Sequence, residues 1–173
     1  MNKNKQTITL MCGLARSGKS TWVEKNKGDA VVICPDKIRS TIFGHQFHKN
    51  AEDWIWTLAK SFAHLLLEQG KSIIVDATMI IYEFRAPWIS MAATYNTDIK
   101  IVWVKTTLEE CLKRNKKSGA KKIPEEALTR MANYFENPSY GPEKKIQVLE
   151  IANNKKQEKV SGPINYYVRN NGL

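Results

Sequence analysis

The amino-acid sequence predicts a three-layer α/β/α fold, in which a five-stranded parallel sheet lies between layers of helices. Short apolar runs rich in β-branched residues alternate with longer helical patterns, which is typical of βαβ units. The segment Gly13–Ser20, between the first apolar run and the first helical pattern, has the spacing G-x-x-x-x-G-K-[ST]. The 173 residues suffice for one domain with a sizeable core, and the 42% hydrophobic and 25% charged content is ordinary for a globular chain.

Five apolar runs account for the predicted strands. They are Thr7–Cys12, Ala30–Cys34, Ser72–Asp76, Ile99–Lys105 and Lys145–Ile151. The third run has an unbroken apolar centre, as expected for a strand that is buried on both faces of a parallel sheet.

Six segments with helical spacing separate or follow these strands. They are Lys19–Lys27, Pro35–Phe43, Ala51–Gln69, Glu83–Thr94, Leu108–Lys117 and Pro124–Phe135. Within the third helix, large apolar residues recur every three or four positions and form one stripe. The stripe consists of Trp54, Ile55, Leu58, Phe62, Leu65 and Leu66. Because Trp54 lies on this stripe, we expect it to pack in the core rather than to stack on a nucleic-acid base.

Composition narrows the classes of partner and compartment. The net charge of +10 creates a field that attracts polyanions, which favours a nucleic-acid partner. No apolar run is long enough to span a bilayer, and the first six residues lack the apolar stretch of a signal peptide. We therefore expect a cytoplasmic protein with no membrane partner. The odd set Cys12, Cys34 and Cys111 fits neither a disulfide framework nor a zinc site, and we expect buried thiols.

The motif at residues 13–20 predicts a phosphate-binding loop, or P-loop. Glycine at its two fixed positions lets the backbone wrap phosphate groups without clashes from a Cβ atom. The loop amides and the N-terminus of the following helix direct positive charge at the same point. Lys19 supplies a cation for the β- and γ-phosphates, and the Ser20 hydroxyl is a ligand for Mg²⁺. The predicted nucleotide-binding residues are Gly13, Ala15, Arg16, Ser17, Gly18, Lys19, Ser20, Thr21 and, from a later segment, Arg114. The predicted cofactors are ATP and Mg²⁺.

Asp76 ends the third strand, where an acid is costly to desolvate unless it has a task. In P-loop proteins this position usually meets Mg²⁺ or orients substrate. We therefore expect Asp76 and Ser20 to be the metal ligands. The structural alternative is an aspartate that caps the next turn.

Asp36 and Arg39 follow the second strand and lie three residues apart at the start of a helix, so they share a face. Both are expected at the carboxyl end of the sheet, where open α/β sheets bind ligands. A carboxylate there can accept the proton of an attacking hydroxyl, and an arginine can neutralise a transferring phosphoryl group. The alternative is an acid favoured by the helix dipole beside an exposed arginine.

The basic segment Lys113–Lys122 lies between two helices, after the fourth strand. In nucleoside-phosphate kinases such a segment is a lid that closes over ATP and brings an arginine to the triphosphate. We expect the lid at about residues 107–136, with Arg114 as the inserted cation and Arg130 as second choice. The alternative is a solvated charged face. His45 and His48 lie in a polar loop, and we expect at most one of them to contact substrate.

From Thr7 to about Ile151 the chain resembles the kinase domain of polynucleotide 5′-kinases of phage and bacterial end-healing enzymes. The matching pieces are the P-loop, Asp36-Lys-Ile-Arg39, Val75-Asp76-Ala-Thr78, and Lys113-Arg114-Asn through Gly119 to Pro124. The resemblance implies that Asp36 is the general base for a 5′-hydroxyl, that Arg39 contacts the acceptor's phosphate and that Asp76 lies near the acceptor and the metal. It also implies that Arg114 is a lid arginine. The chain departs from some members at Ser118, where they carry a second lid arginine.

We therefore expect a single P-loop kinase domain over residues 1–173, with a tail after Asn153 to which the sequence assigns no structure. The expected reaction moves the γ-phosphoryl group of a nucleotide donor to a hydroxyl, foremost the 5′-hydroxyl end of DNA or RNA. Catalysis is assigned to Asp36, Arg39, Lys19 and Arg114. One alternative keeps the chemistry with a nucleoside, nucleotide or sugar as acceptor. Another is a nucleotide-binding regulator or nucleic-acid-binding ATPase that performs no transfer.

Overall fold

A computed structural model describes residues 6–44, 49–119, 122–140, 142–143 and 145–152. His45, His48 and Lys121 lie outside the described residues, as does the tail after Asn153.

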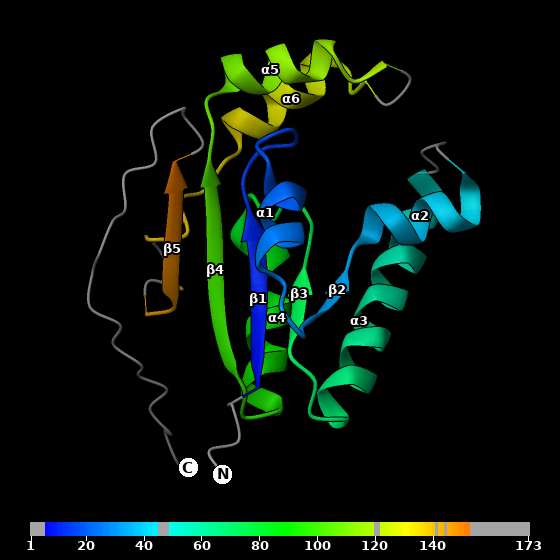
Figure 1. The fold of residues 1–173 in the computed structure, drawn as a ribbon, viewed down its shortest axis with the longest axis vertical. Helices are drawn as coiled ribbons and strands as arrows, with labels where there is room; N and C mark the ends of the chain where they lie inside the picture. Colours follow the sequence, from blue (N-terminus) through cyan, green and yellow to red (C-terminus); the bar gives the residue numbers. More distant parts are fainter. Residues whose placement is uncertain (1–5, 45–48, 120–121, 141, 144, 153–173) are drawn as a thin grey trace.

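All the strands run parallel in one five-stranded sheet, in the order β2-β3-β1-β4-β5 (Figure 1). The strands are β1 (Thr7–Cys12), β2 (Val31–Ile33), β3 (Ile73–Val75), β4 (Asp98–Lys105) and β5 (Gln147–Ala152). The strands β1 and β3 are almost wholly buried, whereas β2 and β5 form the edges and are partly exposed. The predicted parallel sheet and its strands are thus confirmed, with strand ends shifted by one or two residues.

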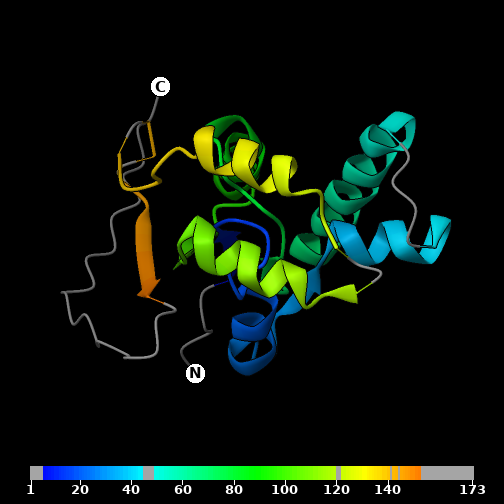
Figure 2. The same cartoon turned by 90° about the horizontal axis from the view of Figure 1, so that it is seen from above.

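Helices cover both faces of the sheet and its carboxyl end (Figures 1 and 2). They are α1 (Lys19–Asn26), α2 (Pro35–Phe43), α3 (Glu52–Glu68), α4 (Tyr82–Thr94), α5 (Leu108–Lys116) and α6 (Glu125–Asn133), with a short 3₁₀ turn at Lys49–Ala51. Helix α1 packs on one face of the sheet, and α3 and α4 pack on the other. Helices α5 and α6 cross above the carboxyl ends of the strands.

Alternation along the strands divides the core between the two faces. Odd and even positions of a strand point to opposite sides, so Ile8 and Leu10 face α3 and α4 whereas Met11 faces α1. Each fully buried side chain of this size contributes about 1.5–3 kcal/mol relative to an exposed one. The larger cluster, under α3 and α4, fixes the sheet on which the loops of the carboxyl end rest.

The expected core position of Trp54 is wrong, because 72% of its surface is exposed. Helix α3 instead buries small and aliphatic residues against the sheet, namely Ile55, Ala59, Ala63 and Leu67. Phe62 and Leu65 are each 51% exposed. The helix is apolar over more than one face, and the small alanines allow it to lie close to the strands, so the bulkier row points away from them.

The three cysteines are buried and unpaired, as the sequence predicted. Burial raises the pKa of the Cys12 thiol to about 11, so it stays a neutral core side chain. In the part of the chain that the structure describes, no helix is long and apolar enough to cross a membrane.

A buried ion pair fastens the segment before β5 to helix α4. Arg85 is 1% exposed, and its Nε donates to Oε1 of Glu143 over 2.8 Å. Its Nη1 donates to the Met79 carbonyl over 2.7 Å, in the loop that follows β3. The side chain of Glu143 is fully buried. The pair therefore holds the β3–α4 loop, which carries Asp76, against a segment far along the chain.

Removing one partner of this pair is expected to destabilise the fold strongly. Glu143→Ala leaves the buried guanidinium with only the half-exposed Glu136, at 4.0 Å, as a counter-charge, and should lower the free energy of unfolding by about 3–5 kcal/mol. Urea denaturation measures this as a lower midpoint. The double variant Arg85→Met/Glu143→Met should lose less than Glu143→Ala, since no uncompensated charge remains buried. Equal losses in both variants would contradict this assignment.

Candidate active site at the carboxyl end of the sheet

Four connections leave the carboxyl edge of the sheet, and three of them carry residues that the sequence predicted for the site. The P-loop follows β1, Asp36 follows β2, Asp76 follows β3 and Thr106 follows β4. Because the strands are parallel, these four connections lie at the end of the sheet that α5 and α6 cover (Figures 1 and 2). The sheet thereby brings together residues that are far apart in the sequence, such as Ser17 and Thr106, which are 89 positions apart.

The P-loop has the backbone shape that its glycines permit. Gly13 has φ +136° and Gly18 has φ +107°, while Arg16 adopts φ +68°, which is uncommon for a residue with a side chain. A Cβ atom at Gly13 would lie 2.7 Å from the Val104 carbonyl oxygen and 3.0 Å from Ser17 Oγ. The concave loop therefore requires glycine at this position, and it opens onto the N-terminus of α1, where backbone amides favour anions. This geometry fits a phosphate group.

Lys19 is buried against the loop that it follows. Its Nζ donates to the carbonyl oxygens of Gly13 over 3.0 Å and Leu14 over 2.7 Å. Burial lowers the pKa of Lys19 to about 8, and the carboxylates of Asp76 and Asp36 oppose that shift. Asp76 and Asp36 therefore both act electrostatically on Lys19.

The depressed pKa of Lys19 makes a pH prediction for nucleotide binding. Above pH 8 the free protein increasingly carries a neutral Lys19, and phosphate groups favour the charged form. ATP binding should therefore take up a proton, and its affinity should fall as the pH rises through 8. Calorimetry in buffers of different ionisation enthalpy measures the uptake.

Lys19→Met should abolish this proton uptake, whereas Lys25→Met, which alters an exposed residue of α1, should leave it intact. A Lys25 variant that also lost the uptake would contradict the assignment.

The lowered pKa of Lys19 also affects the stability of the fold. Between pH 8 and the ordinary value of 10.5 the unfolded chain holds more protons than the native one, so the contribution of Lys19 to stability rises with pH.

Two oxygen donors flank the phosphate loop. Ser20 is exposed on the first turn of α1, and Asp76 is 7% exposed at the end of β3. Hydroxyl and carboxylate oxygens are suitable ligands for Mg²⁺, which usually keeps waters and shares nucleotide phosphates rather than filling an all-protein cage. Among the described residues, no group of three or more His, Cys, Asp or Glu side chains could hold a metal by itself. The donor set therefore fits a metal ion that arrives with a nucleotide.

Asp36 and Arg39 share a face of α2 and form an ion pair of 2.5 Å between Arg39 Nη1 and Asp36 Oδ1. Arg39 is also held by Glu52 at the start of α3, through Nε–Oε1 at 2.7 Å and Nη2–Oε2 at 2.8 Å. This bidentate contact raises the pKa of Arg39 above its usual range. The Asp36 side chain is 86% exposed, so its carboxylate faces solvent at the mouth of the site.

Helix α5 places Arg114 directly on the P-loop. The Nη1 atom donates to the carbonyl oxygens of Arg16 over 3.2 Å and Ser17 over 3.0 Å. Glu110, one turn earlier, accepts a bond of 2.9 Å from Arg114 Nε and orients the guanidinium. Thr106 adds a hydroxyl bond to the Ser17 carbonyl over 2.9 Å.

The turn between α5 and α6 is held by a fully buried amide, Asn115. Its Oδ1 accepts from the Ile123 amide over 2.9 Å, and its Nδ2 donates to the Ile123 carbonyl over 2.6 Å. Arg16 Nε also donates to Asn115 Oδ1 over 3.3 Å, which connects this turn to the P-loop. Ser118 donates to the Arg114 carbonyl over 3.1 Å. Its hydroxyl therefore caps the end of α5.

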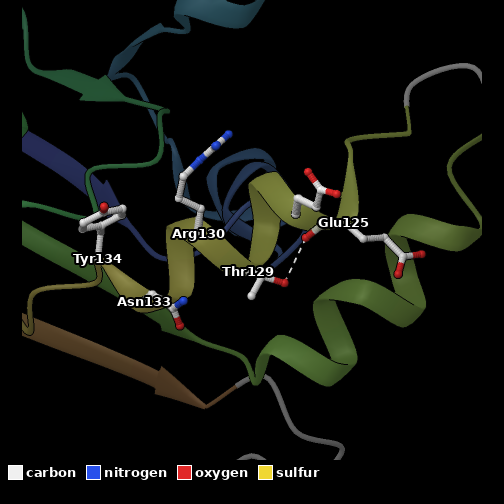
Figure 3. Close-up of a pocket in the computed structure, with 6 residues that line it drawn as sticks. Glu125, Thr129, Arg130, Asn133 and Tyr134 are labelled. Carbon is white, nitrogen blue, oxygen red and sulfur yellow. Dashed lines mark hydrogen bonds between the residues drawn. The ribbon is translucent and has the colours of Figure 1, made fainter.

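Arg130 occupies a different place from Arg114. It lies on α6 beside a pocket that is lined by Glu125, Glu126, Thr129, Arg130, Asn133 and Tyr134. Figure 3 shows Arg130 and Asn133 extending from opposite sides of α6, with Thr129 bonded to the Glu125 carbonyl. The lining residues come from one helix and its end, and none of them belongs to the phosphate loop.

The sequence from residue 8 to residue 138 matches the AAA domain family (AAA_33). The match covers more than half of the chain. The chain belongs to the AAA domain family. The helices, the parallel sheet and the P-loop together form the P-loop kinase fold.

Proteins that are similar to this AAA domain chain carry names that refer to different molecules. An L-seryl-tRNA(Sec) kinase of Methanococcus maripaludis is 28% identical over 139 residues, which cover 76% of this chain and 53% of the relative. A chain of the Pnkp1/Rnl/Hen1 RNA repair complex superposes with a TM-score of 0.67 and 21% identity, covering 78% of this chain and 46% of the other. The Mycobacterium tuberculosis APS kinase CysC, in complex with AMPPNP and APS, gives 0.61 and 20%, covering 88% and 91%. The chain thus spans about half the length of the first two.

Sequence reasoning missed three residues of this AAA domain site. Glu52 binds Arg39 across the connection between α2 and α3, and no local spacing indicates a partner 13 positions away. The side chains of Asn115 and Thr106 form hydrogen bonds to backbone groups, and the tertiary fold determines which groups these are. Asn115 sits inside the run Arg114-Asn-Lys, so its position within a basic segment was the one available signal.

Proposed function

We propose that this AAA domain protein is an ATP- and Mg²⁺-dependent phosphotransferase that phosphorylates a 5′-hydroxyl end of RNA or DNA. In this proposal residues 1–173 form one kinase domain, and α5, the turn and α6 form a lid at about residues 107–136. The P-loop and Lys19 receive the donor's phosphates, with Ser20 and Asp76 as the metal ligands. Bound Mg²⁺ neutralises charge on the phosphate oxygens.

The observation that carries the proposal is the exposure of Asp36 beside the phosphate loop. Its side chain is 86% exposed and still influences the pKa of buried Lys19. A base in this position can meet the end of an acceptor too large to enter a closed cavity. Arg39, oriented by Glu52, lies on the same helix face and offers a cation to the acceptor's own phosphate.

The reaction follows from these positions. Asp36 accepts the proton of the acceptor hydroxyl as its oxygen forms a bond to the γ-phosphorus. The bond from that phosphorus to the β–γ bridging oxygen breaks, and ADP leaves with the electron pair. Lys19 and Arg114 stabilise negative charge on the transferring group, whose oxygens carry most of it in such reactions. The α5–α6 lid excludes water, which would otherwise compete as acceptor.

A nucleic-acid acceptor is supported by charge and by relatives. The net charge of +10 favours a polyanion. Near the site, the last turn of α5 carries three basic residues, Lys113, Arg114 and Lys116, and Arg114 contacts the P-loop. Two of the similar proteins are named for RNA substrates or RNA repair. A small acceptor is the second candidate. The APS kinase favours a small acceptor, because that kinase and this chain match over nearly the whole length of both.

The test is transfer from γ-labelled ATP to short single-stranded RNA and DNA with a 5′-hydroxyl, compared with 5′-phosphorylated twins. The proposal predicts label on the 5′-hydroxyl strands alone. It also predicts an acceptor affinity that falls steeply with salt, since phosphate contacts release counterions. A panel of nucleosides, nucleotides, sugars and adenylyl sulfate forms the second arm. Label there, with none on either oligonucleotide, overturns the nucleic-acid acceptor and keeps the phosphotransferase.

A further inference from the structure

A second surface lies on α3, away from the phosphate loop. Four large apolar side chains form an exposed stripe along this helix. Trp54 is 72% exposed, Phe62 and Leu65 are each 51% exposed, and Leu58 is 37% exposed. We call these four residues the α3 stripe. Thr57 and Ser61 lie beside it, so no charged side chain falls within it.

The α3 stripe faces neither the core nor helix α4. At about 100° per residue, its centre lies roughly 120° around the helix from the buried row of Ile55, Ala59, Ala63 and Leu67. His64 and Glu68 lie roughly 120–160° from the buried row in the other rotational direction, and so mark the other flank of α3. Tyr95, at the end of α4, meets His64 Nδ1 at 3.0 Å and donates to Glu68 over 3.3 Å. The stripe therefore points beyond the β2 edge of the sheet, where α3 stands in Figure 1.

The size of the stripe is appropriate for an interface. Aromatic side chains bury about 150–250 Å² each when covered, so the four residues expose on the order of 400 Å² of apolar surface. This area is within the range of about 300–600 Å² for the largest apolar patch of a monomer, and such a patch is often functional. Two copies that covered each other's stripe, with the polar rim around it, would bury roughly 1,000 Å², which is the lower limit for a specific interface.

Charge decides between a second copy and a nucleic acid as the occupant. Helix α3 carries three acidic residues, Glu52, Asp53 and Glu68, against the single Lys60, and so has a local charge of −2 in a chain of +10. Single-stranded nucleic acids stack on aromatic residues within positively charged grooves, which this helix does not offer.

We propose that the α3 stripe is the interface of a symmetric homodimer, in which α3 packs antiparallel on α3 of a second copy. The spacing of the stripe is self-complementary about a point near Lys60. Trp54 then meets Leu65 of the second copy, and Leu58 meets Phe62. Antiparallel packing also aligns the helix dipoles favourably. The phosphate loop lies at the carboxyl end of the sheet, away from this interface. This inference does not depend on the identity of the acceptor.

Sedimentation velocity of the full chain, from micromolar to hundred-micromolar concentration, tests the proposal. The expected result is a monomer–dimer equilibrium that strengthens as salt screens the repulsion between two chains of charge +10. Phe62→Glu and Leu65→Glu should each weaken it by at least about tenfold, because a charge would be buried at the interface. Because both residues are exposed in the single chain, the thermal stability of the two variants should stay near that of the unaltered protein. Phe84→Glu is the matched control, as Phe84 is 47% exposed on α4, outside the stripe.

A second measurement uses a cysteine at the centre of the stripe. Under mild oxidation Ser61→Cys should cross-link to its own copy, because residue 61 lies close to the two-fold axis, whereas Ser90→Cys on α4 should not. The native cysteines are buried and leave the reaction clean. A chain that stays monomeric over the whole range overturns the proposal. So does a dimer that Phe62→Glu and Leu65→Glu leave unchanged.

Discussion

Asp36→Ala is expected to lower the rate of phosphoryl transfer by about 10²- to 10⁴-fold while ATP binding persists. The variant loses the carboxylate that accepts the hydroxyl proton. It also releases one of the two acidic partners of Arg39, so the acceptor is positioned less well. Single-turnover transfer with saturating ATP measures the chemical step, and fluorescent-nucleotide titration measures binding.

Because Asp36 is exposed and its ion pair with Arg39 lies at the surface, the variant should fold normally. Asp53→Ala is the matched control, since Asp53 is another exposed acid in the first turn of a helix, outside the site. It should leave transfer unchanged. Asp36→Asn keeps the size of the side chain and should be nearly as slow as Asp36→Ala, because the amide cannot accept the proton.

This variant also separates a kinase from a protein that only binds nucleotide. A nucleotide-binding regulator or an ATPase without transfer has no need of Asp36. If Asp36→Ala retained full activity toward every acceptor in the panel, the assignment of Asp36 as the base would be wrong. If the unaltered chain hydrolysed ATP equally well with and without acceptors, an ATPase would be the better reading.

The sequence was sufficient for the sheet and the phosphate loop, because both depend on local signals. Apolar runs that alternate with helical patterns indicate the strands, and the spacing from Gly13 to Ser20 indicates the turn at the start of α1. The orientation of α3 was not predictable in this way. Its apolar residues cover more than half of the helix surface, so the pattern could not say that Ala59 and Ala63 rather than Trp54 meet the sheet.

The site divides along the same line. Asp36 and Arg39 were predictable as a pair because they are one helical turn apart. Glu52 was not, because its contact with Arg39 depends on how α2 and α3 are packed. Likewise, the basic segment 113–122 led to the prediction of a lid, with Arg114 ahead of Arg130 as its inserted cation. The bonds from Arg114 to the P-loop carbonyls could not be foreseen, because they depend on the position of α5.

Arg114→Ala is expected to reduce the turnover number by about 10³- to 10⁵-fold, the range associated with an arginine that stabilises a transferring phosphoryl group. In the structure its guanidinium donates to two neutral carbonyls of the P-loop. Phosphate oxygens are stronger, charged acceptors at the same position, so the side chain needs only a small movement to exchange partners. Arg114→Lys should recover only part of the loss, since lysine lacks the planar fork.

Arg130→Ala distinguishes this assignment from the second choice for the inserted cation. Arg130 lies on α6 at a pocket that no P-loop residue lines, and its loss should change turnover less than about threefold, as expected for an exposed residue outside the reacting groups. In Arg114→Ala, by contrast, the Michaelis constant for ATP should rise by a smaller factor than the factor by which the turnover number falls. The reason is that the contact of Arg114 with the phosphate matters most when charge builds on the transferring group. A slow Arg130→Ala beside a normal Arg114→Ala would transfer the role to α6. It would also mean that the lid must rotate from its position in this structure before phosphoryl transfer can occur.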